Sequence, residues 1–233
     1  MIYHKEERKV SSKITLEEIT LNAITLFPAW RGQTAVCIAG GASLTKEQVD
    51  AAIADNCRII AINDAYKLAP DADILYACDF KWWEWHKGCP DFKGYKLQHY
   101  PEARLNNMSI ALPYPDIDAF LSSGNGGFEE RMDRQRHGGN SGYQALHIAM
   151  QLGASKIILI GYDMGVNSDK THWFGEHPGQ SPNANNQKYE NWIQEFPALK
   201  EAADKRGQRI INATIKTRLK CFEQMTIEEA LNA

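Results

Sequence analysis

The sequence has 233 residues, of which 43% are hydrophobic and 24% are charged, a composition typical of a globular domain. It carries 26 Lys and Arg against 29 Asp and Glu, so no basic excess indicates binding to nucleic-acid phosphates. No apolar run reaches the length of a transmembrane helix. The first residues are charged and lack the apolar segment typical of a signal peptide, and the 5 cysteines form no CxxC pair. We therefore expect a cytoplasmic protein with reduced thiols.

Residues 1–30 are expected to stand apart from the remainder of the chain. Residues 1–13 are polar and predict a weakly structured arm. Apolar residues in 14–26 recur at helical spacing, and Phe27-Pro28 ends the pattern. We expect a single domain over 31–233.

The stretch 35–50, AVCIAGGASLTKEQVD, predicts a strand, a turn of small residues and a helix. Thr45 and Gln48 have the spacing of a capping box at the helix start. A turn of this kind directs backbone N–H groups at an anion, and Gly40 and Gly41 allow close approach. From these residues alone, a phosphate-binding turn and an ordinary strand-to-helix turn are equally supported.

Two further strands are predicted to end in polar residues. The near-continuous apolar runs 58–63 and 74–78 suit buried parallel strands, and Asn63-Asp64 and Asp79 stand at their carboxyl ends. In open α/β sheets, ligands bind beyond the carboxyl ends of the strands. Each polar residue alone is typical of an ordinary loop, but together they favour a site at one edge of the sheet.

The middle of the chain is less regular. Residues 80–88, FKWWEWHKG, predict a short helix in which Trp82 and Trp85 share a face. We favour a role for this helix in anchoring the core over an aromatic wall for a base or sugar. Strands are expected at 95–99 and 108–112, within a small variable lobe at 89–135.

The sequence again predicts regular helices and strands after residue 140. A helix ending at Gly153 and a strand at 156–160 precede Asp163, and the aperiodic stretch 164–186 predicts a lid loop. Helical residues 187–205 with a break at Pro197, a strand at 209–212 and a helix at 226–231 follow. The predicted class is α/β, with a Rossmann-like, mostly parallel sheet and helices on both faces.

Four segments resemble the bacterial lipooligosaccharide sialyltransferases and a related Rossmann-like superfamily. That superfamily includes 6-hydroxymethylpterin diphosphokinases and uncharacterised phage or prophage proteins. The segments are AGGASL at 39–44, AIND at 61–64, NSGYQALHIAMQLGASKIILIGYDM at 140–164 and THWFG at 171–175. The third segment is the most specific, and residues 80–135 are poorly covered.

The resemblance implies a transferase, with a glycosyltransferase as the leading expectation. It would move a group from a nucleotide sugar, such as a CMP-linked donor, to a hydroxyl acceptor. His172 would be the general base, a role suited to a side chain whose pKa is near neutral. Lys170 would steady the leaving phosphate. The candidate nucleotide-binding residues are Gly40, Gly41, Ser43, Asn63, Asp64, Asp79, Asn140, Ser141, Gly142 and Asp163.

The chain also departs from the family pattern. The usual asparagine of the nucleotide loop is replaced by Gly40, and the tyrosine pair that steadies the leaving phosphate has no clear match. The arginine before the TSG motif is displaced to Arg136. A zinc site at His172 and His177 has no supporting motif, so no metal is expected under the leading hypothesis.

Two other functions remain open. A diphosphokinase acting on a small heterocycle such as a pterin would need Mg²⁺, held by carboxylates such as Asp64, Asp79 and Asp163. Trp82, Trp85 or Trp173 would stack the heterocycle. A non-catalytic nucleotide-binding phage accessory protein is the third hypothesis. A homo-oligomer is compatible with each.

Overall fold

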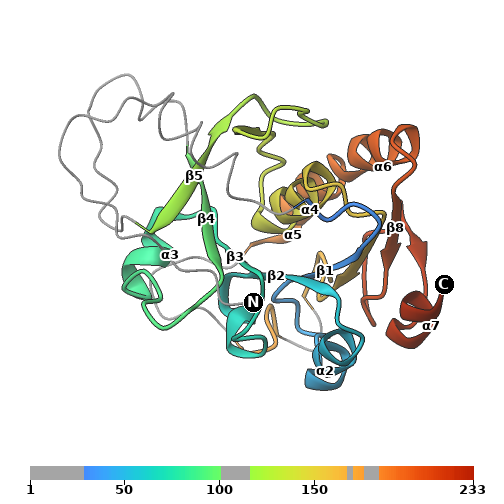
Figure 1. Cartoon of the computed structure of the whole chain (residues 1–233), viewed down its shortest axis with the longest axis horizontal. Coiled ribbons are helices and arrows are strands. Elements are labelled where there is room, and N and C mark those ends of the chain that lie inside the picture. The colour runs from blue at the N-terminus through green and yellow to red at the C-terminus, as the bar shows by residue number, and fades with distance from the viewer. Residues whose placement is uncertain (1–28, 101–115, 167–169, 176–183) are drawn as a thin grey trace.

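The computed structural model describes residues 29–100, 116–166, 170–175 and 184–233 (Figure 1). The arm and helix expected within 1–28, the strand expected at 108–112, and His177 lie outside these residues.

The described residues form one parallel sheet, which confirms the predicted α/β, Rossmann-like class. Its spatial order is β6-β5-β4-β3-β2-β1-β7-β8-β9, and every pairing is parallel. The strands are β1 (Thr34–Ile38), β2 (Arg58–Ile62), β3 (Ile74–Tyr76), β4 (Tyr95–Tyr100), β5 (Ile117–Ser122), β6 (Arg134–Gln135), β7 (Lys156–Ile160), β8 (Arg209–Asn212) and β9 (Glu223–Gln224).

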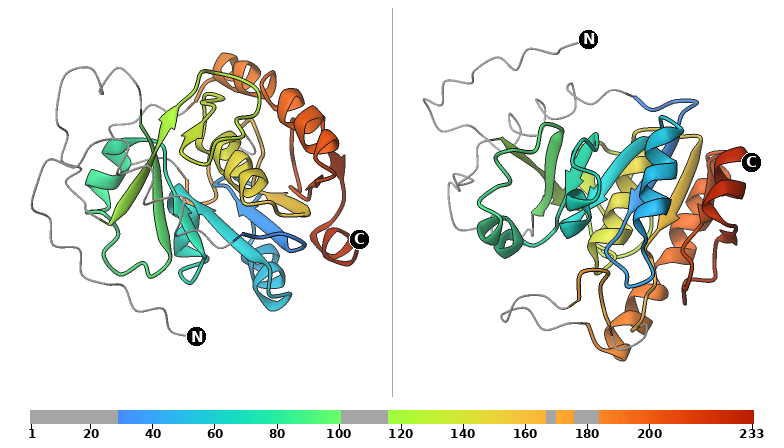
Figure 2. Two further views of the ribbon diagram at one scale, coloured as in Figure 1. Left: turned by 45° about the horizontal axis from the view of Figure 1, so that its top comes forward. Right: turned by 90° about the horizontal axis from the view of Figure 1, so that it is seen from below.

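Helices cover both faces of the sheet (Figures 1 and 2). The described helices are α2 (Lys46–Ala54), α3 (Phe80–Trp85), α4 (Ser141–Gln151), α5 (Asn186–Ile193), α6 (Phe196–Lys205), α7 (Ile227–Asn232) and the 3₁₀ helix η1 (Asn63–Lys67). None of the helices in the described ranges is long and apolar enough to cross a membrane.

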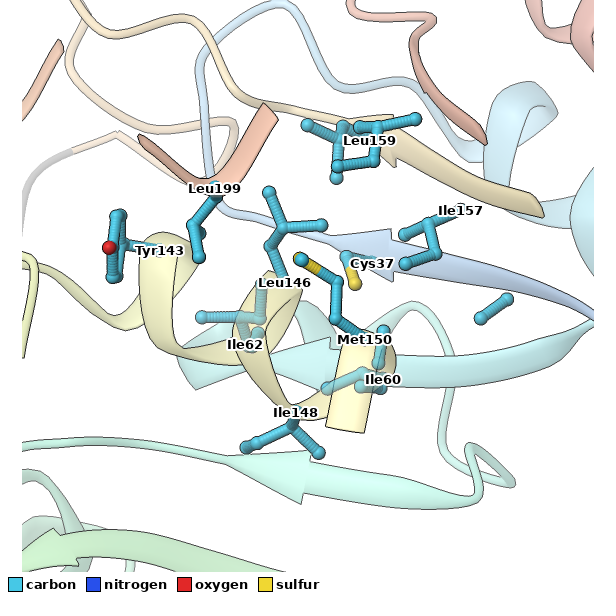
Figure 3. Close-up of a cluster of buried hydrophobic side chains, with 14 of the residues drawn as sticks. Cys37, Ile60, Ile62, Tyr143, Leu146, Ile148, Met150, Ile157, Leu159 and Leu199 are labelled. Atoms are coloured by element: carbon cyan, nitrogen blue, oxygen red, sulfur yellow. The ribbon is translucent and has the colours of Figure 1, made fainter. Parts of the chain in front are cut away.

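Alternate residues of each central strand enter different cores. In β1, Ala35 and Cys37 join the cluster under α4 and α6, whereas Val36 and Ile38 join the cluster under α2, α3 and α7. Figure 3 shows the first cluster, with Leu146 of α4 directed at the sheet. Because strand side chains alternate and both faces are covered, these strands must be apolar throughout.

The order of the strands reverses beside β1. The first six strands extend the sheet in one direction, and α4 then carries the chain back so that β7 pairs with the free edge of β1. In doubly wound sheets the carboxyl edge at such a reversal is where ligands bind. The structure therefore places the switch point between Gly40-Gly41 after β1 and Gly161–Asp163 after β7.

Several local predictions are confirmed. Thr45 caps α2, and both halves of its capping box with Gln48 are present. Helical residues 187–205 are divided into α5 and α6, with Pro197 in the first turn of α6. A helix-starting proline is tolerated because the first-turn N–H groups have no partner within the helix.

The structure adds to two local predictions. The described part of 89–135 supplies β4, β5 and β6 of the same sheet. In α3, Trp82 and Trp83 are buried and Trp85 is 39% exposed, so Trp83 joins Trp82 in anchoring the helix. Trp83 is held in the core because its indole N–H donates to the Ala77 carbonyl at 3.0 Å. The core-anchoring role favoured for this helix agrees with the burial.

Candidate functional site

The glycine turn after β1 is locked to Asp163 after β7. The Ser43 amide and hydroxyl donate to the two carboxylate oxygens of Asp163, each at 2.8 Å. The Gly41 amide donates to the Gly161 carbonyl at 2.9 Å. Three residues predicted from distant segments therefore meet at the switch point. The acceptor for the Ser43 amide is a protein carboxylate that is only 3% exposed.

Gly41 is required by this arrangement for steric reasons. A Cβ atom at this position would lie 2.1 Å from Asp163 Oδ1 and 2.4 Å from the Gly161 carbonyl oxygen. At Gly40 the nearest atom to an added Cβ would be His172 Nδ1, at 3.5 Å, which is ordinary contact. The close approach predicted for the glycine pair is thus made at Gly41, and the approaching group is part of the protein.

The lid segment 170–175 lies directly against the glycine turn. His172 forms an isolated antiparallel β-bridge with Gly41, and the Trp173 amide donates to the Gly40 carbonyl at 3.2 Å. His172 Nδ1 is 3.2 Å from the same carbonyl oxygen. Since a carbonyl can only accept, Nδ1 is the nitrogen that carries a hydrogen in this contact. In the neutral ring, the lone pair is then on Nε2.

Aromatic contacts support this imidazole. The Phe174 ring lies parallel to His172, with centroids 5.1 Å apart and an interplanar angle of 2°. Lys67, from η1 after β2, places its Nζ 6.0 Å from the Phe174 ring centre. The lid segment thus extends from the end of β1 towards the end of β2. Lys170, the predicted partner for the leaving phosphate, is exposed at the start of the segment.

Two basic residues that the sequence reasoning missed also reach the switch point. The Lys216 amide lies 3.4 Å from Ser43 Oγ, and the Arg218 amide donates to the Asp163 carbonyl at 2.9 Å. Both side chains are exposed, and Arg218 forms an ion pair with Glu190. They follow β8, whose place beside β7 cannot be read from local sequence. Their local pattern is that of an ordinary charged turn.

Asn63 and Asp64 are directed to different surroundings. Asn63 is half-buried at the carboxyl end of β2, with a positive φ of 49° that asparagine tolerates better than most residues. Asp64 is buried and accepts a hydrogen bond from Trp82 Nε1 at 3.0 Å as well as one from Lys67. Burial raises the Asp64 pKa, but these two donors outweigh burial and leave the pKa below its ordinary value. Asp64 thus anchors α3.

Asp79 is exposed after β3, at the N-cap of α3, where its side chain makes no capping hydrogen bond. The residues at the start of α4 have structural partners. The Asn140 side chain accepts from the Tyr143 amide at 2.8 Å, and Ser141 Oγ accepts from the Cys78 amide at 3.2 Å. The Gly142 carbonyl accepts from the Tyr162 hydroxyl at 2.9 Å. The first turn of α4 is therefore fixed to the ends of both β3 and β7.

A cavity of about 340 Å³ lies at the opposite, amino-terminal edge of the sheet. Arg58 in its wall donates to Asp73 at 2.8 Å and to Gln33 at 2.6 Å. Because these charged and polar groups satisfy one another, we attribute the cluster to the stability of the β1–β3 edge. The residues predicted for function all lie elsewhere.

Other chemistries find little support in the described part of the chain. No group of three or more His, Cys, Asp or Glu side chains that could hold a metal occurs there. The cysteines are free, and burial raises the pKa of the Cys37 and Cys78 thiols to about 12. Such thiols are protonated at neutral pH and are poor nucleophiles.

Comparison of the chain with protein-family models, with curated proteins and with solved structures gave no match.

Proposed function

We propose that this protein is a transferase that binds a nucleotide-activated donor at the carboxyl edge of the sheet and passes the activated group to a hydroxyl acceptor. A glycosyl group is the leading candidate. The observation that carries the proposal is the position of His172, which is held against Gly40 and Gly41 at the switch point. A general base beside the ligand-binding edge of a doubly wound sheet suits group transfer.

The proposed reaction assigns one step to the imidazole. The acceptor hydroxyl gives its proton to His172 Nε2 while its oxygen forms a bond to the donor carbon. The bond from that carbon to the phosphate oxygen breaks, and its electron pair leaves with the nucleotide. Lys170, exposed at the start of the lid segment, is the proposed partner for the charge that develops on the phosphate.

The contacts of Asp163 argue for where the donor phosphate lies. Its carboxylate already accepts from the Ser43 amide and hydroxyl, and a phosphate in the same position would meet a like charge. The first turn of α4 offers amides at Ser141 and Gly142, and the positive end of the helix dipole favours an anion there. We therefore propose that the phosphate lies between Asn63 and the start of α4.

Nucleotide binding and base catalysis can be tested separately. Thermal shift and calorimetry with nucleoside monophosphates, diphosphates and nucleotide sugars should identify a nucleotide that binds the wild-type protein. His172→Ala should retain that binding and lower transfer by about 10²- to 10⁴-fold, the usual contribution of general base catalysis. The matched control is His86→Gln, because His86 packs on Trp82 beside α3 and has no proposed catalytic role.

Three results would redirect the assignment. Failure of every nucleotide to bind would contradict the proposal at its first step. Turnover that requires Mg²⁺ and releases AMP would support the diphosphokinase, although Asp64 and Asp163 already accept hydrogen bonds from protein donors. Nucleotide binding with biological activity that survives His172→Ala would support the non-catalytic protein.

A further inference from the structure

A second histidine at the carboxyl edge has no role in the chemistry above. His99, near the end of β4, is 4% exposed, and neither of its ring nitrogens has a hydrogen-bond partner among the described residues. Buried polar atoms are nearly always paired, because burying one without a partner is unfavourable. His99 therefore carries a cost that its protein contacts do not offset.

Polar side chains of β3, β6 and α4 satisfy one another, and one of them, Gln135, is near enough to His99 to raise its pKa. The Tyr76 hydroxyl contacts the side-chain oxygens of Gln135 and Gln144 at 2.9 and 2.8 Å. Gln135 Nε2 donates to the Gln144 carbonyl at 2.7 Å, and Gln144 Nε2 donates to the His137 carbonyl at 2.8 Å. This network fixes His137 against the first turn of α4.

His137 contacts His99 at this edge of the sheet. It is exposed, and its ring meets the His99 ring edge to face, with centroids 5.0 Å apart and an interplanar angle of 80°. An exposed ring therefore lies directly against a buried ring that has both a donor and an acceptor. The carboxyl end of β3 lies beside α4, because Ser141 Oγ accepts from the Cys78 amide. β3 in turn pairs with β4, the strand of His99.

We propose that His99 recognises the nucleoside part of the donor, with the base entering between His99 and the His137 ring. This inference rests on the proposed function. The Asp163 carboxylate repels a phosphate, so we place the donor phosphate near Asn63 and the start of α4. From there the nucleoside extends towards β3 and β4. β4 is two strands from β2, about 10 Å at the usual strand spacing.

The protonation of His99 decides which ligand groups it suits. Burial lowers the His99 pKa to about 4, with a smaller contribution from His137 and an opposing one from the Gln135 side chain. The ring is therefore neutral at pH 7 and offers one N–H donor and one nitrogen acceptor. A heterocyclic base edge, or a ribose hydroxyl, presents the complementary pair. The exposed His137 ring supplies a flat surface on which a base can stack.

The decisive variant is His99→Phe in the full chain, which keeps a planar ring and removes both nitrogens. Calorimetry with cytidine, uridine, adenosine and guanosine should show at least an about tenfold loss of affinity for the nucleoside that the wild type binds. Binding of inorganic pyrophosphate, which has no nucleoside, should be unchanged. The Tm should stay the same or rise, because the substitution removes buried polar atoms that have no partner.

His147→Phe is the matched control. His147 is fully buried on α4, but its Nε2 accepts from the Glu129 amide at 2.9 Å, so it has a structural partner. This variant should lower the Tm and leave nucleoside affinity unchanged. A second measurement needs no variant: addition of the nucleoside to wild-type protein labelled with ¹⁵N-histidine should shift the His99 ring resonances.

The outcomes separate the two proposals. If the wild type binds no nucleotide, both fail. If it binds a nucleotide and His99→Phe binds the nucleoside equally well, the inference about His99 is overturned and the proposed function stands. If His99→Phe does not fold, unchanged His99 ring resonances on addition of the bound nucleoside overturn it instead.

Discussion

Gly41→Ala is expected to destabilise the fold far more than the same substitution at the neighbouring glycine. The added Cβ would lie 2.1 Å from Asp163 Oδ1 and 2.4 Å from the Gly161 carbonyl oxygen, so the two loops must separate. Separation weakens the two Ser43 contacts to Asp163, and hydrogen bonds to a charged group contribute about 1.5 to 3 kcal/mol each. We expect a loss of about 3 to 5 kcal/mol in the free energy of unfolding.

Urea unfolding monitored by tryptophan fluorescence measures this loss directly. At about 2 to 4 °C per kcal/mol for a domain of this size, the Tm should fall by about 6 to 20 °C. The control is Gly40→Ala, whose Cβ meets nothing closer than 3.5 Å and should change stability by less than about 1 kcal/mol. Equal stability of the two variants would refute the argument that Asp163 fills the space above Gly41.

Three further results are expected from equilibrium unfolding. Ser43→Ala should cost about 1.5 to 3 kcal/mol, because Asp163 keeps the amide contact and loses the hydroxyl; a neutral result would mean the hydroxyl contact contributes little. Tyr76→Phe should cost about 1 to 3 kcal/mol, since its hydroxyl bonds buried glutamine oxygens, and an unchanged urea midpoint would contradict this. Burial lowers the pKa of His147 to about 3 and that of His99 to about 4, from 6.5. The unfolded chain therefore binds protons at these two histidines at a pH where the folded chain does not. As the pH is lowered from 6 to 4, the free energy of unfolding should fall by about 1.4 kcal/mol per pH unit for each histidine. His147→Phe should halve that slope, and a slope equal to that of the wild type would disprove the assignment.

Local pattern was sufficient for the central strands and most of the helices because their causes are local, whereas β5, β6 and β9 were not predicted. The run RIIAI of β2 is apolar at every position, as a strand covered on both faces must be. The pairing of Thr45 with Gln48 needs only the first turn of α2. The same logic located the polar residues at the ends of β1, β2 and β7 before any strand order was known.

Local pattern failed where a side chain's surroundings decide its role. Asp64 and Asp79 occupy similar places after neighbouring strands, yet Asp64 is buried against Trp82 and Asp79 is exposed. His99 drew no attention in the sequence, because an isolated histidine near a strand end has no motif. Its unpaired burial is visible only once β4, β6 and α4 are placed together.

The sequence by itself determined the α/β class, the central parallel strands and the set of polar residues at their carboxyl ends. Only the tertiary structure decided which of those residues meet. The return of the chain through α4 sets β7 beside β1, and that pairing brings Asp163 to Ser43 across 120 positions of sequence. Periodicity reports which face of an element is buried, whereas contacts between distant strands depend on the order in which the whole sheet is assembled.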